Sequence, residues 1–338
     1  MSINSNRNIA IVCGGDSSEY EVSVRSARGL HSFFDHDRYN VYIVLVRGTQ
    51  WTVMIDGEEP HTVDRNDFSF TDSSGRHVRF DYAYITIHGT PGENGIFQGY
   101  LDLLRIPYST SNVLVEALTF DKFVLNNFLR AFGVTVPDSI LLRRDDSHRP
   151  SDADIVARMG LPCFVKPVAD GSSFGVTKVK TVADLTPALD EAFALCNDVM
   201  VERFVDGTEV TVGCYKTREK SVAFPVTEVV THNEFFDYNA KYNGEVDEIT
   251  PARISDTLRD KLQQETLRLY DLLHCNGIIR IDYIVTRDAQ GDDVINLIEI
   301  NTTPGMTATS FIPQQVRAAG LEMKDVLADI VDNQFVEG

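Results

Sequence analysis

The first third of the chain alternates apolar runs with helical patterns, and this order constrains the fold more than any other feature. Three runs are typical of buried strands, and helical spacing of apolar residues follows the first and the third. The predicted strands are 8–15, 39–46 and 82–89, and the predicted helices are 17–34 and 95–106. Strands interleaved with helices predict a parallel sheet, whose binding sites lie beyond the carboxyl ends of its strands. The sequences "GGDSSE" and "HGTPGENG" fall at those ends.

A second unit, of α+β type, is predicted for residues 120–206. Asp121 is placed to cap a helix, and Gly133 is placed to end it. A strand, a helix and a second strand follow, and then the glycine- and serine-rich loop "ADGSSFG" at 169–175. A strand, a helix and a strand complete this unit, which leaves residues 1–119 as an N-terminal α/β unit.

A third unit, also of α+β type, is predicted for residues 207–338. Its first strands are expected at 209–216 and 220–229, and a long polar loop follows at 231–255. An amphipathic helix, which we expect to end at Gly277 as its C-cap, leads into two more strands. The sequence "RDAQGD" between these strands has the composition of a hairpin turn, so the two strands are expected to pair.

Composition limits the partners that such a chain can have. The 338 residues carry a net charge of −19, from 31 basic and 50 acidic residues, which disfavours binding to nucleic acid and to an anionic membrane. No apolar run approaches the roughly 20 residues that span a bilayer, and the first residues lack a signal-peptide pattern, so we expect a cytoplasmic protein. The five cysteines form no CxxC pair and are expected to be small buried hydrophobes.

The last two predicted strands carry polar residues that a buried strand does not need. Arg280 and Asp282 share one face of the first strand, and Glu299 and Asn301 share one face of the second. If the strands form a hairpin, Asp282, Glu299 and Asn301 converge on one cleft, with Arg280 beside them. Two carboxylates and an amide oxygen are suitable ligands for magnesium. The alternative is a polar strand end that meets solvent.

The loop at 169–175 is a candidate phosphate site. Lys166 ends the strand before it, and its glycines, beside Ser172 and Ser173, would let backbone N–H groups approach phosphate oxygens. A plain hairpin loop would be equally rich in glycine. The chain has no Walker loop and no GxGxxG after its first strand, which argues against a dinucleotide-binding Rossmann site.

Three further charged residues are informative only beside these clusters. Lys122 starts a predicted helix, and Glu202 and Glu209 flank a short turn. A carboxylate can accept hydrogen bonds from an adenine amine or from ribose hydroxyls. Each of the three, taken alone, is equally well explained as a solvated surface residue.

The segment 231–255 is polar but rich in aromatic residues. Long loops without secondary structure often act as lids over an active site. In a lid, Lys241 would neutralise a phosphate and Tyr242 would reach a substrate. The alternative is a surface loop that its aromatic residues anchor.

Taken together, these motifs resemble the D-alanine–D-alanine ligase family of the ATP-grasp superfamily. The resemblance covers essentially the whole chain, in family order, and "GGDSSEYEVS" and "EINTTPGMT" are its most specific parts. It is also carried by "HGTPGENGIFQG", "VKPVADGSSFGV", "FFDYNAKY" and "IRIDY". It implies ATP-grasp architecture, in which the second and third units grip ATP and the first binds an amino acid.

The resemblance implies roles for individual residues. Those that would surround the nucleotide are Lys122, Lys166, Ser173, Glu202, Arg203, Val205, Glu209 and Lys241. Those that would hold two magnesium ions, for which manganese could substitute, are Asp282, Glu299 and Asn301. Those that would bind the two D-alanine molecules are Glu19, His88, Arg280, Gly305, Ser310 and Phe311. The group near the reacting atoms would comprise Glu19, Ser172, Tyr242, Arg280 and Gly305.

The implied activity is the ATP-dependent joining of two D-alanine molecules through an acyl phosphate, for peptidoglycan synthesis, by a homodimer. Two positions depart from the family pattern: Phe236 replaces a tyrosine and Arg203 replaces a lysine. The alternatives are another ATP-grasp carboxylate–amine ligase, including one that uses D-lactate or D-serine, and an ATP-grasp protein that binds nucleotide without catalysis. Retention of Arg280, Gly305 and the N-terminal motif argues against the last of these.

Overall fold

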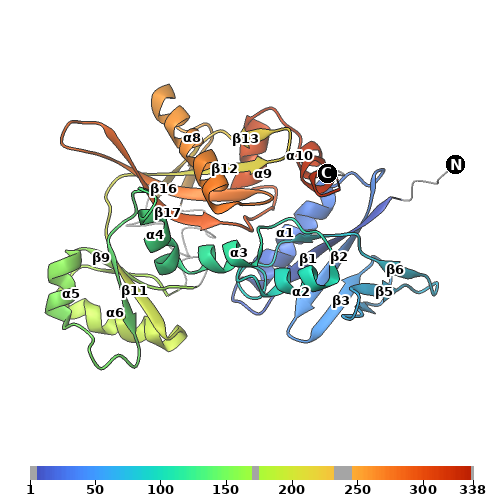
Figure 1. Ribbon diagram of the computed structural model, residues 1–338, viewed down its shortest axis with the longest axis horizontal. Helices are drawn as coiled ribbons and strands as arrows, with labels where there is room; N and C mark the ends of the chain where they lie inside the picture. Colours follow the sequence, from blue (N-terminus) through green and yellow to red (C-terminus); the bar gives the residue numbers. More distant parts are fainter. Residues whose placement is uncertain (1–5, 170–174, 232–245, 336–338) are drawn as a thin grey trace.

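The computed structural model describes residues 6–169, 175–231 and 246–335. Three larger sheets with their helices, together with one two-stranded sheet, make up the described part of the fold (Figure 1). The N-terminal sheet has the strand order β4-β3-β2-β1-β7, and a small two-stranded sheet, β5-β6, lies beside it. The bounds of these strands are β1 (Arg7–Gly14), β2 (Tyr39–Arg47), β3 (Gln50–Met54), β4 (His61–Thr62), β5 (Ser69–Thr71), β6 (His77–Arg79) and β7 (Tyr82–Ile85).

The predicted parallel arrangement is confirmed for the centre of the N-terminal sheet. β1 pairs in parallel with both β2 and β7. The sheet also has an antiparallel edge, formed by β3 and β4, which was not predicted. This edge forms because a tight turn at Gly48 reverses the chain directly after β2. Helices α1 (Tyr20–Phe33) and α2 (Ile96–Leu104) pack on opposite faces of the sheet.

Two short helices connect this part to the central sheet. They are α3 (Val113–Phe120) and α4 (Lys122–Arg130). The predicted cap of the second is confirmed, because the Asp121 carboxylate accepts a hydrogen bond of 2.9 Å from the Val124 N–H. The Lys122 N–H donates to the carbonyl of Val168 at 2.9 Å, which links the start of α4 to the central sheet.

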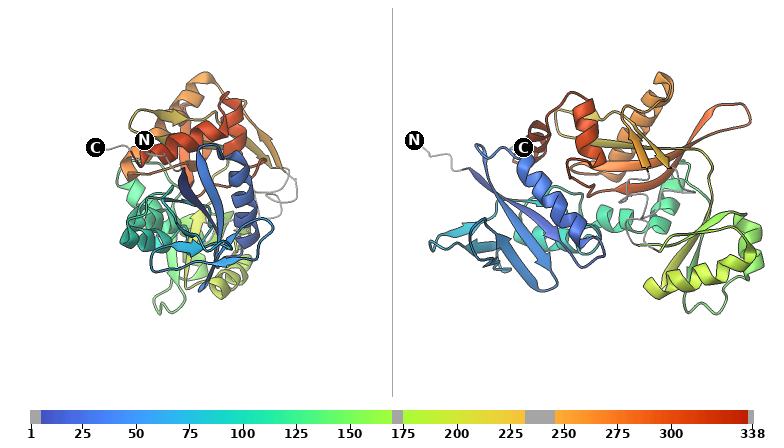
Figure 2. Two further views of the ribbon diagram at one scale, coloured as in Figure 1. Left: turned by 90° about the vertical axis from the view of Figure 1, so that its right-hand side faces the viewer. Right: turned by 180° about the vertical axis from the view of Figure 1, so that it is seen from behind.

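The central sheet has the order β10-β9-β11-β8, and all its pairings are antiparallel. Its elements are β8 (Ser139–Arg143), α5 (Asp152–Met159), β9 (Cys163–Pro167), β10 (Thr177–Val179), α6 (Val182–Leu195) and β11 (Asp198–Arg203). Their buried side chains form a hydrophobic cluster drawn only from residues 140–201. Figure 2 shows this unit at the opposite end of the molecule from the N-terminal sheet.

The third sheet has the order β15-β14-β12-β16-β17, with β13 paired to β12. Its strands are β12 (Thr208–Lys216), β13 (Ser221–Ala223), β14 (Thr227–Thr231), β15 (Val246–Ile249), β16 (Ile279–Arg287) and β17 (Asp293–Asn301). Its helices are α8 (Asp256–Leu273), α9 (Phe311–Ala318) and α10 (Met323–Asn333). The predicted hairpin between the last two strands is confirmed.

Three predictions about this third part are wrong in detail. The helix α8 ends at Leu273 rather than Gly277, because His274 takes the left-handed conformation at φ 53° and closes the helix. The strand expected at 220–229 is interrupted between β13 and β14, where Pro225 has no N–H to donate to a ladder. The expected loop at 231–255 contains the strand β15.

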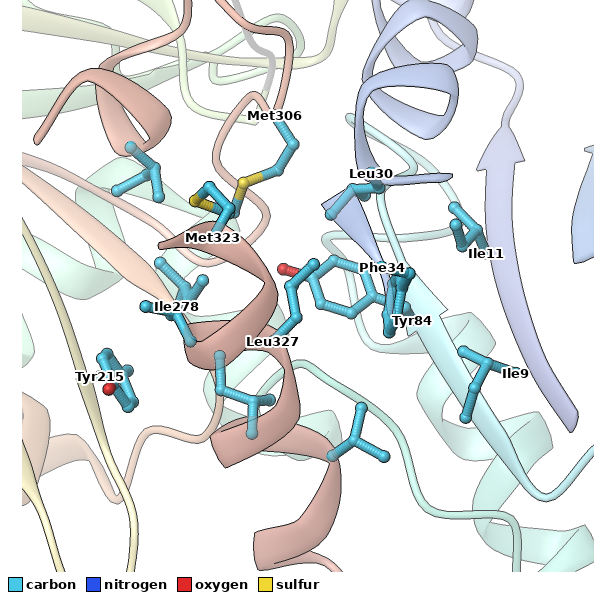
Figure 3. Close-up of a cluster of buried hydrophobic side chains, with 14 of the residues drawn as sticks. Ile9, Ile11, Leu30, Phe34, Tyr84, Tyr215, Ile278, Met306, Met323 and Leu327 are labelled. Atoms are coloured by element: carbon cyan, nitrogen blue, oxygen red, sulfur yellow. The ribbon is translucent and has the colours of Figure 1, made fainter. Parts of the chain in front are cut away.

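One hydrophobic core joins the first and third sheets. It combines Leu30 of α1 and Phe34, directly after that helix, with Leu327 of α10 and Ile278 beside β16. Figure 3 shows α10 between the two sets of side chains, with Met306 at the upper edge of the cluster. The first and third sheets are therefore held in one packed body.

Two findings on the described residues bear on the expectations from composition. None of their helices is both long and apolar enough to cross a membrane. The five cysteines are free thiols. Cys13, Cys163 and Cys214 are buried as predicted, whereas Cys196 and Cys275 are only partly buried. Burial raises the pKa of the Cys13 thiol to about 12, which leaves it unreactive at neutral pH.

Candidate active site

The hairpin of β16 and β17 brings the predicted cluster together. Its register sets Asp282 opposite Glu299 and Arg280 opposite Asn301. The alternation of burial along β16 follows the predicted two faces, with Ile281 fully buried on the other side. The four polar side chains therefore lie on one face of the sheet.

Asp282 is the centre of a hydrogen-bond network on that face. Its carboxylate accepts two hydrogen bonds of 2.9 Å from the Arg280 guanidinium and one of 3.0 Å from the Asn301 amide. The Thr211 hydroxyl donates a fourth, at 2.5 Å. Burial opposes the charge of Arg280, but the nearby carboxylates of Asp282, Glu299 and Glu248 raise its pKa above the ordinary value. Arg280 is thus fixed in both position and charge.

Glu299 faces a different cation. Its carboxylate lies 3.4 Å from the ammonium of Lys122, at the start of α4. The described residues hold no group of three His, Cys, Asp or Glu side chains that could bind a metal. Asn301 donates its amide N–H to Asp282, which leaves its amide oxygen for a cation. Two carboxylates and an amide oxygen fit magnesium, which prefers hard oxygen ligands.

A cavity of about 330 Å³ opens beside this hairpin. It is lined by residues from the N-terminal part, from α4 and from the third sheet. The predicted site residues in its wall are Glu19, His88, Lys122, Arg280, Glu299, Asn301, Gly305, Ser310 and Phe311. These residues are distant in sequence, and the fold gathers them around one space.

The N-terminal wall contains Glu19 and His88. Glu19 is 7% exposed and stands at the N-cap of α1, where its N–H donates to the Ser17 hydroxyl at 3.2 Å. His88 is buried, and its Nε2 has no hydrogen-bond partner among the described residues. Burial and the charge of Arg280 lower the pKa of His88, and Glu19 only partly opposes them. A neutral imidazole with an open nitrogen can therefore bind a ligand.

The opposite wall is formed by the start of α9. Ser310 is the N-cap residue, and its hydroxyl accepts a hydrogen bond of 3.1 Å from the Thr307 N–H. A Cβ on Gly305 would lie 3.0 Å from that hydroxyl, so glycine leaves the backbone open there. The Arg280 guanidinium lies 5.2 Å from the centre of the Phe311 ring, within the range of a cation–π contact.

The predicted nucleotide residues of the central sheet lie apart from this cavity. Lys166 on β9 and Glu202 on β11 form a buried ion pair of 2.6 Å, and the Asn126 amide donates to Glu202 at 3.5 Å. The Arg203 side chain is exposed and donates to the carbonyl of Arg158 at 3.1 Å.

Of the other residues predicted to bind the nucleotide or to belong to the lid, two lie in the described residues shortly after β11. Val205 lies in the turn after β11, and Glu209 lies on β12 opposite Val229 and Ile284. Five positions lie outside the described residues, namely Ser172, Ser173, Phe236, Lys241 and Tyr242.

Two carboxylic acids of the site were not predicted. Glu93 lines the cavity and accepts hydrogen bonds of 2.7 Å from the Gly89 N–H and from the Thr303 hydroxyl. Burial, with the charges of Glu19 and Glu299, raises the pKa of Glu93 to about 7, against the lowering effect of its hydrogen bonds.

Glu116 is fully buried and accepts hydrogen bonds from the Ser111 N–H at 2.8 Å and the Thr302 hydroxyl at 2.6 Å. Burial raises its pKa well above the ordinary value. A sequence signal did exist for Glu116: it is the one carboxylate in the apolar helix "VLVEALTF", and a buried carboxyl group needs partners.

Comparison with known families gives two matches that together span most of the chain. The family model described as D-ala D-ala ligase N-terminus matches residues 8–111. The model described as D-ala D-ala ligase C-terminus matches residues 128–332.

Curated relatives and solved structures match almost end to end. A D-alanine–D-alanine ligase of Bacteroides fragilis is 60% identical over 329 residues, which is 97% of this chain and 99% of that protein. The D-alanyl-alanine synthetase A of Vibrio cholerae superposes with a TM-score of 0.85 at 26% identity, over 98% of this chain and 99% of that one. The VanG D-Ala:D-Ser ligase of Enterococcus faecalis superposes with a TM-score of 0.84 at 28% identity, over 97% of this chain and 99% of that one.

The fold is that of an ATP-grasp ligase, as the sequence motifs predicted. More specifically, the chain belongs to the D-alanine–D-alanine ligase family. The family resemblance drawn from the sequence is therefore confirmed. The individual residue roles and the three domain boundaries stay predictions.

Proposed function

We propose that this protein joins two D-alanine molecules into D-alanyl-D-alanine, with ATP as the energy source, for peptidoglycan precursor synthesis in the cytoplasm. One observation carries the proposal. The cavity places Glu19 and His88 of the N-terminal part opposite the β16–β17 hairpin and the open backbone of Gly305. An ammonium group, a carboxylate and a phosphoryl group can each find a partner of opposite charge around that space.

The chemistry needs an activated carboxylate, because a free carboxylate is a poor acyl donor. The terminal phosphoryl group of ATP passes to the carboxylate of the first D-alanine, and an acyl phosphate forms. The amine of the second D-alanine then attacks the carbonyl carbon, and inorganic phosphate leaves. Phosphoryl transfer depends mainly on positioning and on charge stabilisation.

The residues of the cavity take these tasks in turn. Glu19 receives the ammonium of the first D-alanine, and His88 lines its pocket. Arg280 and the Gly305 N–H stabilise the oxyanion that forms when the second amine attacks. Arg280 can do so without reorganising, because Asp282 already accepts hydrogen bonds from Nε and Nη2 along one edge of its guanidinium. Ser310 and Phe311, at the start of α9, receive the carboxylate of the second D-alanine.

The nucleotide would lie between the central and third sheets. Lys166 and Lys122 would face its phosphates, and Glu202 and Glu209 its adenine and ribose. Glu202 is well prepared for this role, because Lys166 fixes one of its oxygens. Ser172, Ser173, Lys241 and Tyr242 complete the proposed site from the segments outside the described residues.

Magnesium, or manganese in its place, would be held by Asp282, Glu299 and Asn301, and when bound it supplies positive charge that neutralises the phosphates. Arg280 forms an ion pair with Asp282, and Lys122 forms one with Glu299.

A homodimer is the proposed assembly, and its interface is proposed on α2 and α3. Leu103 of α2 is 85% exposed and Leu114 of α3 is 74% exposed, and Ile96 is exposed nearby. Exposed apolar side chains on two neighbouring helices often mark protein–protein contacts. Replacing Leu103 and Leu114 with Glu should convert a dimer into a monomer in sedimentation experiments. An unchanged dimer would place the interface elsewhere.

The alternative second substrates are D-lactate and D-serine. The proposed lid segment has Lys241 followed by Tyr242 and no histidine at positions 233–252. A cationic imidazole in the lid would repel an incoming ammonium, whereas a neutral tyrosine does not. We therefore expect a dipeptide product near pH 7 even with D-lactate in excess. Dominant ester product in a D-alanine and D-lactate competition would refute this specificity.

The proposed function is tested by ADP formation that depends on added D-alanine, with the product identified by its mass. L-alanine serves as the control substrate. The expected product is D-alanyl-D-alanine. ATP turnover that ignores D-alanine, or nucleotide binding without turnover, would contradict the proposal.

A further inference from the structure

The segment that follows β17 connects two predicted parts of the site. Asn301, the last residue of β17, is a proposed magnesium ligand, and Gly305 is a proposed oxyanion contact. Thr302 and Thr303 lie between them and are each 3% exposed. The position of these two threonines therefore decides where both groups stand relative to the N-terminal wall of the cavity.

Both threonines are bound by carboxylic acids from the N-terminal half of the chain. The Thr303 hydroxyl donates to Glu93 at 2.7 Å, and the Thr302 hydroxyl donates to Glu116 at 2.6 Å. We call these two hydrogen bonds the Glu–Thr contacts. They span 210 and 186 positions of sequence, so they join parts of the chain that the backbone does not hold together.

Each acid is itself anchored at its second oxygen. The Gly89 N–H donates to the other oxygen of Glu93 at 2.7 Å. Gly89 directly follows His88, so this anchor lies beside the proposed pocket of the first D-alanine. The Ser111 N–H donates to the other oxygen of Glu116 at 2.8 Å. Each acid is thus a two-ended bridge between N-terminal backbone and one threonine.

Stability alone does not account for acids at these places. Burying a carboxyl group is costly, and well-packed apolar residues of similar volume are often as stabilising or more so. Glu116 lies in an otherwise apolar stretch of α3, where an aliphatic side chain would pack readily. What the acids add is a directional bond of fixed length to each threonine.

We propose that Glu93 and Glu116 are positioning residues, which fix Asn301 and Gly305 relative to Glu19 and His88 through the Glu–Thr contacts. This inference rests on the proposed function of the cavity and adds two pairs of residues to it. The pairs touch neither reacting carboxylate nor phosphate in this role. They act on the reaction through the segment from Asn301 to Gly305.

The test removes one partner of a contact at a time. The variant T303V deletes the hydroxyl but keeps the β-branched shape, and E93A deletes the acid. Because a misplacement of about 1 Å can cost on the order of 100-fold in rate, we expect kcat to fall at least about tenfold in each variant. We expect the KM for ATP to change by less than about threefold, because the nucleotide residues lie elsewhere.

Two conservative variants should restore activity. T303S keeps the hydroxyl, so its contact with Glu93 survives. In E93Q, the amide oxygen can accept from the Gly89 N–H while the amide N–H donates to the Thr303 hydroxyl. That hydroxyl can turn toward the carbonyl of Ile87, which lies 3.5 Å away. Both variants are expected to keep most of the wild-type kcat.

The matched control is T266V, which removes a buried hydroxyl far from the cavity. Thr266 of α8 hydrogen-bonds to the Tyr283 hydroxyl at 2.9 Å, so its loss should lower thermal stability and leave kcat unchanged. If T303V and E93A behave like T266V, the positioning role is refuted.

T303V and E93A remove opposite partners of one bond, so either one that folds is sufficient for the test. The coupling energy of the double variant E93A/T303V should show that the two losses are not additive. If the kcat losses of E93A and T303V are additive, the Glu93–Thr303 hydrogen bond is not the cause of either loss. A wild-type protein that makes no dipeptide would instead refute the proposed function, and the positioning role with it.

Discussion

One hydrophobic cluster combines side chains of the first and third parts, whereas the cluster of the central sheet contains none from either. Residues as distant in sequence as Ile9 and Val331 belong to the shared cluster, but the central cluster is drawn only from residues 140–201. The proposed amino-acid site is lined by residues of the first and third parts, which we call the shared body, whereas Lys166 and Glu202 lie in the central sheet. If the proposed sites are correct, the amino-acid pockets lie in one packed body, and the nucleotide would bind between two bodies that have separate hydrophobic clusters.

The largest effect is expected at the junction of these two bodies, where Lys122 meets Glu299. The variant E299Q keeps the size of the side chain and removes its charge. If Glu299 holds magnesium, D-alanine-dependent phosphate release should fall by about three orders of magnitude or more. Circular dichroism should show an unchanged fold. An active E299Q with normal thermal stability would remove Glu299 from the metal site.

Two single variants, one in each body, should each weaken the binding of a different substrate. E19A should raise the KM for the first D-alanine by about 30-fold, because a charge-assisted hydrogen bond is lost from the shared body. K166A should instead raise the KM for ATP by a similar factor, because the lysine belongs to the central sheet. Titration of each ligand against each variant is the measurement. Equal losses of both ligands in either variant would mean a structural role.

Two core variants test the separation of the bodies directly. Leu327 in the shared core and Leu189 in the central core are both fully buried, so each Leu→Ala change should cost about 3 kcal/mol of unfolding free energy. L327A should weaken D-alanine binding more than ATP binding, and L189A should do the reverse. Calorimetry with each ligand gives the comparison. Identical ligand profiles would show that the molecule behaves as one body.

The smallest effect is a pH dependence at the edge of the shared body. The folded-state pKa of Glu93 is about 7 and its ordinary value is 4.5, so its contribution to stability is complete below pH 4.5 and is lost as the pH rises through 7. The amide that E93Q introduces does not titrate. In the absence of ligands, the unfolding free energy of E93Q minus that of wild type should therefore rise by about 2 kcal/mol between pH 5 and pH 8. This value includes a reduction for solvent screening of the Glu93 charge. The measurement is urea unfolding of both proteins at each pH, and a difference between their midpoints that stays constant from pH 5 to pH 8 would contradict this prediction.

Much of the site could be predicted from sequence because its residues follow local rules. Residues two apart on a strand share a face, so Asp282, Glu299 and Asn301 could be grouped from spacing and one hairpin. The cap at Asp121 and the parallel strands at the N-terminus followed from equally local patterns.

The remainder depended on contacts between distant parts of the chain. Glu93 lies in the glycine-rich sequence "HGTPGENG", but its partner Thr303 lies 210 positions away. Gly277 looked like a helix C-cap, yet the glycine is needed there because a Cβ would lie 1.7 Å from the carbonyl of Ser109. Local spacing carries no information about such approaches, and only the packed structure supplies them.

The central claim is that the carboxylate of D-alanine is activated by phosphoryl transfer within the cavity. The most direct measurement uses D-alanine labelled with ¹⁸O in its carboxylate and follows the label by mass spectrometry. If an acyl phosphate forms, one carboxylate oxygen leaves with the phosphoryl group, so each dipeptide formed should be matched by one inorganic phosphate that carries a single ¹⁸O. Inorganic phosphate without label, formed together with D-alanyl-D-alanine, would contradict the account.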